Sequence, residues 1–399
     1  MDVETALIAD PGPLVPMLSS RHPLAFLRNG DGLIGLGEAV RLEFSGPSRL
    51  VDAATAWRSL VAAARVSDPV SRPGTGLVAF GSFAFADDSA ATSVLIVPSV
   101  IVGRRDGVAW ITRVDSAQPP ALQLPGSEFR AAMLPGTMTR SVFTAAVQKA
   151  IEAIEAGRLR KVVIARDLRG HVPADVDLRR AITHLVRSYP DTFTYAVEGL
   201  VGSSPETLVR SEGGVVSARV LAGSAARGAD AESDAESAAT LVASEKEEQE
   251  HGFALQSVLV ALEPHSGSLT ASEHPFTLKL PNLWHLASDV TGTLTDGSSA
   301  LDLVAALHPT AAVAGTPTDA ALAMIAELEP FDRGRYAGPV GWVDAQGDGE
   351  WAVALRCAQV SPDGTVQAFA GAGIVAGSDP DRELAETALK FRPIVDAFG

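Results

Sequence analysis

Four glutamates, in two pairs, have the spacing of metal ligands. Glu247 and Glu250 lie three residues apart in SEKEEQEH, and Glu383 and Glu386 repeat that spacing near the C-terminus. Residues three apart share one face of a helix. Two carboxylate pairs on separate helices suit Mg²⁺, which prefers oxygen ligands and keeps water and substrate oxygens in its shell. The alternative is two solvated acidic faces, because spacing does not show that the helices meet.

Two basic residues lie in predicted strands that are otherwise apolar. Lys161 opens KVVIARDL, where partial desolvation would favour its neutral, proton-accepting form. A strand-end lysine whose ammonium reaches solvent is the alternative. Arg356 lies within WAVALRCAQV, which we expect to be one strand buried on both faces. A buried guanidinium needs an anionic partner, either a ligand carboxylate or a structural salt bridge.

Several other polar or small residues are ambiguous. Glu206 follows Ser-Pro and precedes a strand, which suits either the surface or a site. Gly371 and Gly373 in AGAGIVAG could bring backbone N–H groups near an anion, but the segment is not a dinucleotide-binding fingerprint. His285 and His308 lie beside apolar residues, where a hydrogen-bonded core histidine is the ordinary reading.

The elements that must position these side chains include both strands and helices. Up to residue 114, short apolar runs broken by Gly and Pro predict strands, with one helix over 53–65. Residues 117–136 are Pro-rich and aperiodic, which predicts a linker. We therefore expect a single domain over 1–399, with a sheet-rich part (1–116), this linker and a catalytic part (137–399).

In the part over 137–399, the sequence pattern predicts helices that alternate with strands and hairpins. A helix with a stripe of Val142, Ala146, Ala150, Ile151 and Ile154 should end at Gly157. Further expected elements are a strand at 161–168, a strand at 192–199, hairpins over 206–221 and 338–360, one long helix over 233–262, helices at 300–307 and 318–329, and a strand at 366–371. A last helix should follow a Ser378 or Asp379 cap, with Pro380 first. This mixture predicts an α+β fold with a large, mostly antiparallel sheet.

The composition is that of an acidic globular protein. Of 399 residues, 46% are apolar, and the formal net charge of −16 disfavours binding to nucleic acid or an anionic membrane. The N-terminal MDVETALIADPG lacks the pattern of a signal peptide, and no run approaches the roughly 18 apolar residues of a membrane span. We therefore expect a cytoplasmic protein. Cys357 is the single cysteine, which excludes an internal disulfide, and it should be a small buried side chain.

Taken together, these segments resemble the chorismate-utilising enzyme family, and within it the isochorismate synthases. The resemblance rests on AIEAIEAGRLRKVVIARDL, GSSPETLVR, LAGSAARG, ASEKEEQEH, LWHLAS, LHPTAAVAGTP, IAELEPFDRGRYAGPVGWVDAQGDGEWAVALRCAQV and FAGAGIVAGSDPDRELAETALK. They follow the family's order from residue 142 to the C-terminus, with a looser match at GLVAFGSFAF. The resemblance implies two halves that stack largely antiparallel β-sheets, with helices on the outside.

The resemblance also assigns roles by position. It implies that Lys161 is the general base and Glu206 the general acid. The positions that line the substrate pocket in similar enzymes are Gly223, Ser224, His285, Ala312, Val313, Tyr336, Arg356, Gly371 and Lys390.

The implied substrate, chorismate, is a dianion, and the implied cofactor is Mg²⁺. Its ring carboxylate would meet a metal held by Glu250 and Glu386, with Glu247 and Glu383 acting through water. Arg356 would pair with the enolpyruvyl carboxylate. The base would then activate a water that attacks C2, while the acid protonates the departing C4 hydroxyl.

Other members of the family offer rival activities. Anthranilate synthase uses ammonia and carries a different residue at the position of Lys161. Aminodeoxychorismate synthase keeps the lysine but needs a glutaminase partner, and this sequence contains no glutaminase segment, so we expect a monomer without one. Salicylate synthase is the nearest alternative, because it forms isochorismate and then eliminates pyruvate.

Two further features bear on this choice. Ala312 and Val313 match the small apolar pair of isochorismate synthases, whereas salicylate synthases resemble one another in placing a Thr nearby. Since base, acid and metal positions are all present, a non-catalytic chorismate-binding subunit is disfavoured. The sequence leaves open whether the product would feed menaquinone or siderophore biosynthesis.

Overall fold

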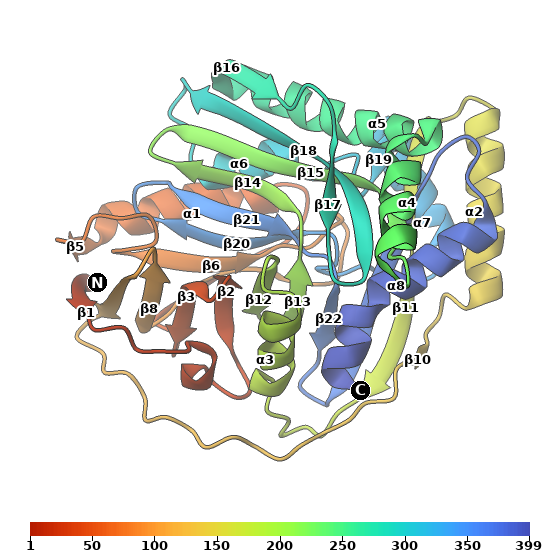
Figure 1. Ribbon diagram of the computed structural model, residues 1–399. Helices are drawn as coiled ribbons and strands as arrows, with labels where there is room; N and C mark the ends of the chain where they lie inside the picture. Colours follow the sequence, from red (N-terminus) through yellow and green to blue (C-terminus); the bar gives the residue numbers. More distant parts are fainter.

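Two stacked β-sheets form the centre of the molecule, which we describe from a computed structural model covering residues 1–399 (Figure 1). The first sheet has thirteen strands and the second has ten, and all pairs are antiparallel except β1 with β5. In order, the first sheet contains β10 (Leu134–Pro135), β11 (Lys161–His171), β23 (Thr365–Ile374), β22 (Cys357–Val360), β13 (Leu200–Ser204), β12 (Phe193–Val197), β2 (Leu24–Arg28), β3 (Asp31–Leu36), β8 (Val100–Arg105), β9 (Val108–Val114), β1 (Asp2–Ile8) and β5 (Arg65–Ser67), with β19 (Gly315–Thr316) beside β11. In order, the second contains β16 (Ser266–Ala271), β18 (Leu283–Leu294), β15 (Val215–Ala226), β14 (Thr207–Glu212), β21 (Gly349–Val353), β20 (Pro339–Asp344), β6 (Val78–Ser82), β7 (Ser93–Val97) and β4 (Val40–Phe44), with β17 (Phe276–Lys279) beside β18.

Both sheets contain strands from both ends of the chain. β2 pairs with β12 in the first sheet, and β6 pairs with β20 in the second. Alternate residues of one strand serve different cores: Phe26 belongs to a 71-residue cluster that includes the facing strands of the two sheets, while Ala25 and Leu27 belong to a 29-residue cluster under helices. The α+β class, with stacked and largely antiparallel sheets, is confirmed.

Eight α-helices cover the sheets. Their bounds are α1 (Arg49–Ala63), α2 (Arg140–Glu155), α3 (Arg179–Ser188), α4 (Ala231–Val242), α5 (Glu245–Leu262), α6 (Ala300–Leu307), α7 (Thr318–Leu328) and α8 (Pro380–Phe398), and short 3₁₀ turns lie at Val15–Met17 and Glu263–His265. α3 and α8 pack on the first sheet, α4, α5 and α6 on the second, and α2 and α7 against β11. None of these helices is both long and apolar enough to cross a membrane.

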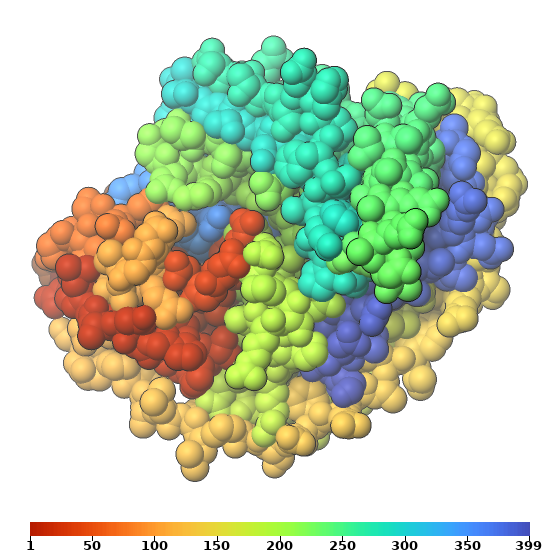
Figure 2. Space-filling model, viewed as in Figure 1, coloured from red at the N-terminus to blue at the C-terminus, as the bar shows by residue number.

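Residues 117–133 form neither helix nor strand. They run along the lower edge of the molecule in Figure 1 and form a surface ridge there in Figure 2. At the other end of the chain, the prediction for α8 is confirmed: the Asp379 side chain accepts hydrogen bonds from the amides of Asp381 and Arg382, and Pro380 is the first helical residue.

Three predictions about elements were wrong. The expected helix over 233–262 is two helices, because Ser244 leaves the helical conformation (ψ 109°) and its side chain caps α5 at the amide of Glu247. Val142 is 43% exposed, and Phe143 and Val147 occupy the inner stripe of α2 instead. The run around Arg356 is two strands, since this residue has a φ of 49° where the chain passes from the second sheet to the first.

Candidate active site

A cavity lies between the two sheets, where residues distant in sequence converge. Its walls come from β11 and β23 of the first sheet, β15 and β18 of the second, the start of α5, the C-terminal half of α8 and the loop after α6. The side chains leave about 50 Å³ in it for the centres of water-sized molecules, and its lining is Val163, Pro205, Glu206, Leu221, Ala222, Gly223, Ser224, Glu250, His285, Ala312, Val313, Tyr336, Leu355, Arg356, Gly371, Gly373 and Lys390.

Two ionisable residues face this region in different environments. Lys161, the first residue of β11, is fully buried, and its Nζ lies 3.3 Å from Glu250 Oε1. Glu206 lies where the chain crosses from β13 of the first sheet to β14 of the second, and it is 4% exposed. Burial raises the pKa of Glu206 to about 8, although Lys161 and Arg356 oppose the shift. Glu206 is therefore a protonated carboxyl at neutral pH, suited to donate a proton.

Arg356 lies where the chain crosses from β21 of the second sheet to β22 of the first, and it has no carboxylate within 4.0 Å. Its Nη2 donates a hydrogen bond of 2.9 Å to His285 Nε2. A guanidinium only donates, so His285 carries its proton on Nδ1, which lies 3.1 Å from the carbonyl of Gly223. Burial and the nearby Arg356 lower the pKa of His285 well below its usual value, which agrees with a neutral ring. The buried guanidinium is thus available for an anionic ligand.

The four paired glutamates lie on α5 and α8 and converge around a lysine. Lys246 Nζ is 3.0 Å from Glu247 Oε1, 3.1 Å from Glu383 Oε1 and 3.9 Å from Glu250 Oε2. Burial opposes the charge of Lys246, but these carboxylates raise its pKa. Burial also raises the pKa of Glu383 to about 7, helped by the neighbouring Glu386.

This arrangement fits a cation. Three carboxylates already point at one ammonium group, and Glu386 pairs with Lys390 at 2.5 Å beside them. No three acidic or histidine side chains form a closed metal cluster as they stand. The donor set is nevertheless oxygen only and strongly acidic, which is the chemistry that Mg²⁺ prefers.

Two glycines give these side chains room. Gly223 has a φ of +83° and lies in a bulge of β15 between Leu221 and Ser224, which turns the strand into the cavity. A Cβ at Gly373 would collide with the Glu250 carboxylate and lie 3.2 Å from Lys161 Cε. A side chain at 373 would therefore displace the groups that face the cavity.

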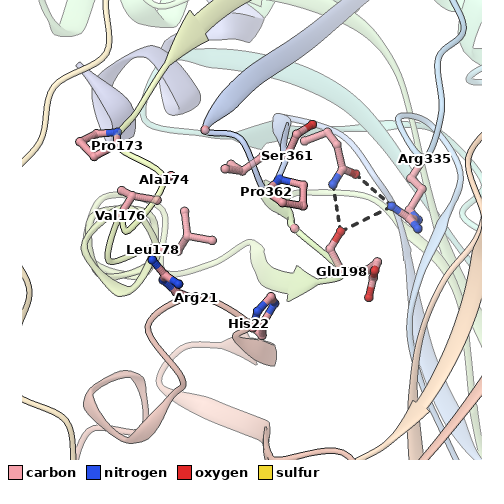
Figure 3. A pocket seen from close by; sticks show the side chains of 14 residues that line it. Arg21, His22, Pro173, Ala174, Val176, Leu178, Glu198, Arg335, Ser361 and Pro362 are labelled. Carbon is pink, nitrogen blue, oxygen red and sulfur yellow. Dashed lines mark hydrogen bonds between the residues drawn. The ribbon is translucent and has the colours of Figure 1, made fainter.

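A larger hollow, with about 320 Å³ for the centres of water-sized molecules, lies elsewhere on the surface (Figure 3). Arg21 and His22 lie on one side of it and Arg335 on the other. The Nη1 of Arg335 is already bonded to Gln359 Oε1 at 3.2 Å and to the carbonyl of Glu198 at 3.5 Å. This hollow lacks a lysine and a carboxylate pair, so it does not offer the acid–base chemistry of the inner cavity.

Comparison with known proteins agrees with this geometry. Residues 24–399 match the family described as chorismate binding enzyme. The chain belongs to this family. A Mycobacterium tuberculosis protein with the provisional name isochorismate synthase MenF is 39% identical over 84% of this chain and 90% of that protein. Isochorismate synthase DhbC of Bacillus subtilis is 41% identical over 63% of this chain and 66% of that protein.

Solved structures of chorismate-binding enzymes have the same architecture. The menaquinone-specific isochorismate synthase MenF of Escherichia coli superposes with a TM-score of 0.79 at 26% identity, over 98% of this chain and 94% of that one. Anthranilate synthase component I of Streptococcus pneumoniae gives 0.73 at 20% identity, over 91% and 92%, and so shows the fold alone.

The cavity of this chorismate-binding enzyme includes every residue that the resemblance placed in the pocket, together with Glu206 and Glu250. Lys161 is not among the lining residues and lies behind one of them, 3.3 Å from the Glu250 carboxylate, while Glu247, Glu383 and Glu386 line an adjoining hollow that shares Ser224. Lys246 was not predicted from the sequence as part of the site. A signal was present, since Lys246 precedes Glu250 by four residues and so shares its helix face.

Proposed function

We propose that the protein is an isochorismate synthase, which converts chorismate to isochorismate with water as nucleophile. The observation that carries the proposal is one cavity lined by a protonated glutamic acid and an arginine without a carboxylate partner, with a buried lysine in contact with the lining residue Glu250. This set supplies a base, an acid and an anion anchor. The names of the relatives support the same activity.

In the proposed mechanism, Arg356 and Lys390 bind the carboxylates of the substrate and fix the ring. Lys161, in its neutral form, removes a proton from a water that attacks C2. The ring double bonds shift, and Glu206 donates its proton to the C4 hydroxyl, which leaves as water. One water enters and one leaves, so the reaction is an isomerisation.

The glutamates of α5 and α8 support Mg²⁺ as the cofactor. Glu250 and Glu386 would be direct ligands, while Glu247 and Glu383 would act through water. When bound, the ion supplies positive charge that neutralises and orients a substrate carboxylate. Ser244 caps α5 by accepting the amide of Glu247, so α5 begins where its two glutamates can face those of α8.

The proposed product is isochorismate and not salicylate. Ala312 and Val313 present small apolar surfaces to the cavity, which hold the ring without forcing the enolpyruvyl group into a geometry for elimination. We further propose a monomer that acts in the cytoplasm, where no glutaminase subunit is needed because water replaces ammonia.

The test is to incubate the purified protein with chorismate and Mg²⁺ and to resolve isochorismate, salicylate and pyruvate by chromatography. Isochorismate as the main product is expected, and EDTA should stop its formation reversibly. Stoichiometric pyruvate with fluorescent salicylate would move the protein to the salicylate synthases. Full activity in EDTA would contradict the role of the glutamates.

A further inference from the structure

A buried ion pair lies behind the wall of the cavity. Arg333 Nη2 is 2.6 Å from Glu329 Oε1, and Arg333 Nε donates to Glu329 Oε2 at 2.8 Å. Both side chains are at most 2% exposed, and neither lines the cavity. The sequence analysis gave these residues no role.

The remaining hydrogen bonds of the pair reach two walls of the cavity. Arg333 Nη2 donates to the carbonyl of Val163 at 2.8 Å, and Nη1 donates to the carbonyl of Val313 at 2.9 Å. Glu329 Oε1 accepts the amide of Ala165 at 2.7 Å. The bonded groups on β11 lie two and four residues after Lys161, so the pair joins the strand that carries the lysine to the loop that carries Val313.

A third wall touches the same guanidinium. The ring of Tyr336, which lines the cavity, has its centroid 5.8 Å from the Arg333 guanidinium, and the centroid of the Phe85 ring, which does not line it, is 4.4 Å from the same group. These contacts, its two bonds to backbone carbonyls and its pairing with Glu329 fix Arg333 in one orientation. Since Val163, Val313 and Tyr336 all line the cavity, one ion pair sets the distances between their walls.

A buried ion pair adds little net stability to a fold, because the desolvation of both charges offsets much of their attraction. It does hold the bonded groups in a fixed orientation, because a planar guanidinium donates hydrogen bonds in fixed directions. We propose that Glu329 and Arg333 are positioning residues that set the place of Lys161 relative to the substrate ring. The proposal rests on the proposed function, because it concerns the same cavity.

The experiment compares this pair with a matched control pair. Arg179 and Asp177 form another buried bidentate pair at 2.6 Å, with side chains 7% and 3% exposed. Arg179 also donates to three backbone carbonyls, those of Pro16, Gln123 and Leu124, all outside the cavity. The variants are E329Q and R333K for the site pair, and D177N and R179K for the control pair. Each is assayed for chorismate turnover at a temperature where circular dichroism shows it folded.

We expect kcat per folded molecule to fall by about 10- to 100-fold in E329Q and R333K, because a small misplacement of a reacting group is costly. KM should change by less than about 3-fold, since Arg356 and His285 remain. D177N and R179K should lower Tm but keep both constants. The double variant E329Q/R333K should lose no more than the worse single variant, because the pair acts as a unit.

A kcat within about 2-fold of wild type in folded E329Q would overturn the proposal, as would equal losses in the control pair. If R333K fails to fold, E329Q alone tests the proposal, because the side-chain amide oxygen of the new Gln can still accept the Ala165 N–H. If wild type turns chorismate into a different product, the proposed function fails, while the same comparison of variants applies to that reaction.

Discussion

At the scale of single residues, the two groups that we propose as proton acceptor and proton donor have different surroundings. Lys161 lies against Glu250, whereas Glu206 is buried without a basic partner within 4.0 Å. Burial without a partner keeps a carboxyl neutral. Glu206 can therefore supply the proton that the proposed mechanism needs at the C4 hydroxyl.

Replacing either group should stop the reaction without unfolding the protein. We expect Lys161→Ala and Glu206→Gln each to lower kcat by about 10² to 10⁴-fold, because each removes one proton-transfer group. Steady-state kinetics gives the loss, and circular dichroism checks the fold. Mg²⁺ affinity should change much less than rate. Near-wild-type turnover in either variant would show that the replaced residue is not needed for proton transfer.

The raised pKa of Glu206 should appear in stability as well as in rate. Its pKa is about 8 in the fold against an ordinary 4.5, so its contribution is fully present below 4.5 and is lost as pH rises through about 8. We expect the Tm of wild type to fall relative to that of Glu206→Gln between pH 5 and 8. The exposed control Glu4→Gln should track wild type. Activity should also decline as pH passes about 8, because the acid loses its proton.

At the scale of elements, turn and capping residues correctly predicted the hairpins and helix ends that depend on local sequence. The hairpin over β20 and β21 and the cap of α8 follow from turn and capping residues, and both are present. The break before α5 did not stand out, because Ser244 lies within a run that is otherwise favourable to a helix. The strands β16, β17 and β18 were not predicted, since their neighbours in the sheet and not their own periodicity determine them.

The site was predictable only in part for the same reason. Spacing showed that Glu247 and Glu250 share a face, but their meeting with Glu383 depends on how α5 and α8 pack. Arg356 was placed in a continuous strand, although its left-handed backbone ends one strand and starts another. The resemblance to a family supplied the pocket residues that spacing alone left open.

The close fit between β23 and α5 gives a prediction at this scale. Gly373→Ala should displace the Glu250 carboxylate, lower activity by at least about 10²-fold and destabilise the protein by roughly 1–3 kcal/mol, as overpacking does. Gly252→Ala is the control, because it lies in α5 with open space around it, and it should stabilise by about 0.5–1 kcal/mol. Kinetics and denaturant unfolding measure both. Equal activity of the two variants would contradict the close approach.

At the scale of the whole molecule, the two parts of the chain are interleaved. Residues before and after the linker share both sheets through β2 with β12 and β6 with β20. Removing either part would leave unpaired strand edges and half of a common core. Folding therefore requires the strands of both parts, and residues 137–399 alone lack part of each sheet.

A cut in the linker should thus be tolerated where a deletion is not. A protease site inserted between Pro119 and Pro120, which are exposed and outside every helix and strand, should allow cleavage with retention of activity and co-elution of the two fragments. Residues 137–399 expressed alone should be insoluble or unfolded. Gel filtration and activity after cleavage test this, and a folded, active 137–399 fragment would show that the parts are independent.

The lysine among the glutamates would make uptake of the proposed Mg²⁺ an exchange of one positive charge for another. Before a divalent ion can bind, Lys246 must release Glu247 and Glu383, so part of the attraction of the site is already satisfied. Lys246→Met should therefore bind Mg²⁺ more tightly in calorimetry, while its metal-free form has a lower Tm than wild type because four carboxylates repel one another. Lys149→Met, on the exposed face of α2, should change neither quantity. An enzyme with its own removable ammonium can keep an acidic site folded when the metal is scarce, and it would release Mg²⁺ more readily than its count of carboxylates suggests.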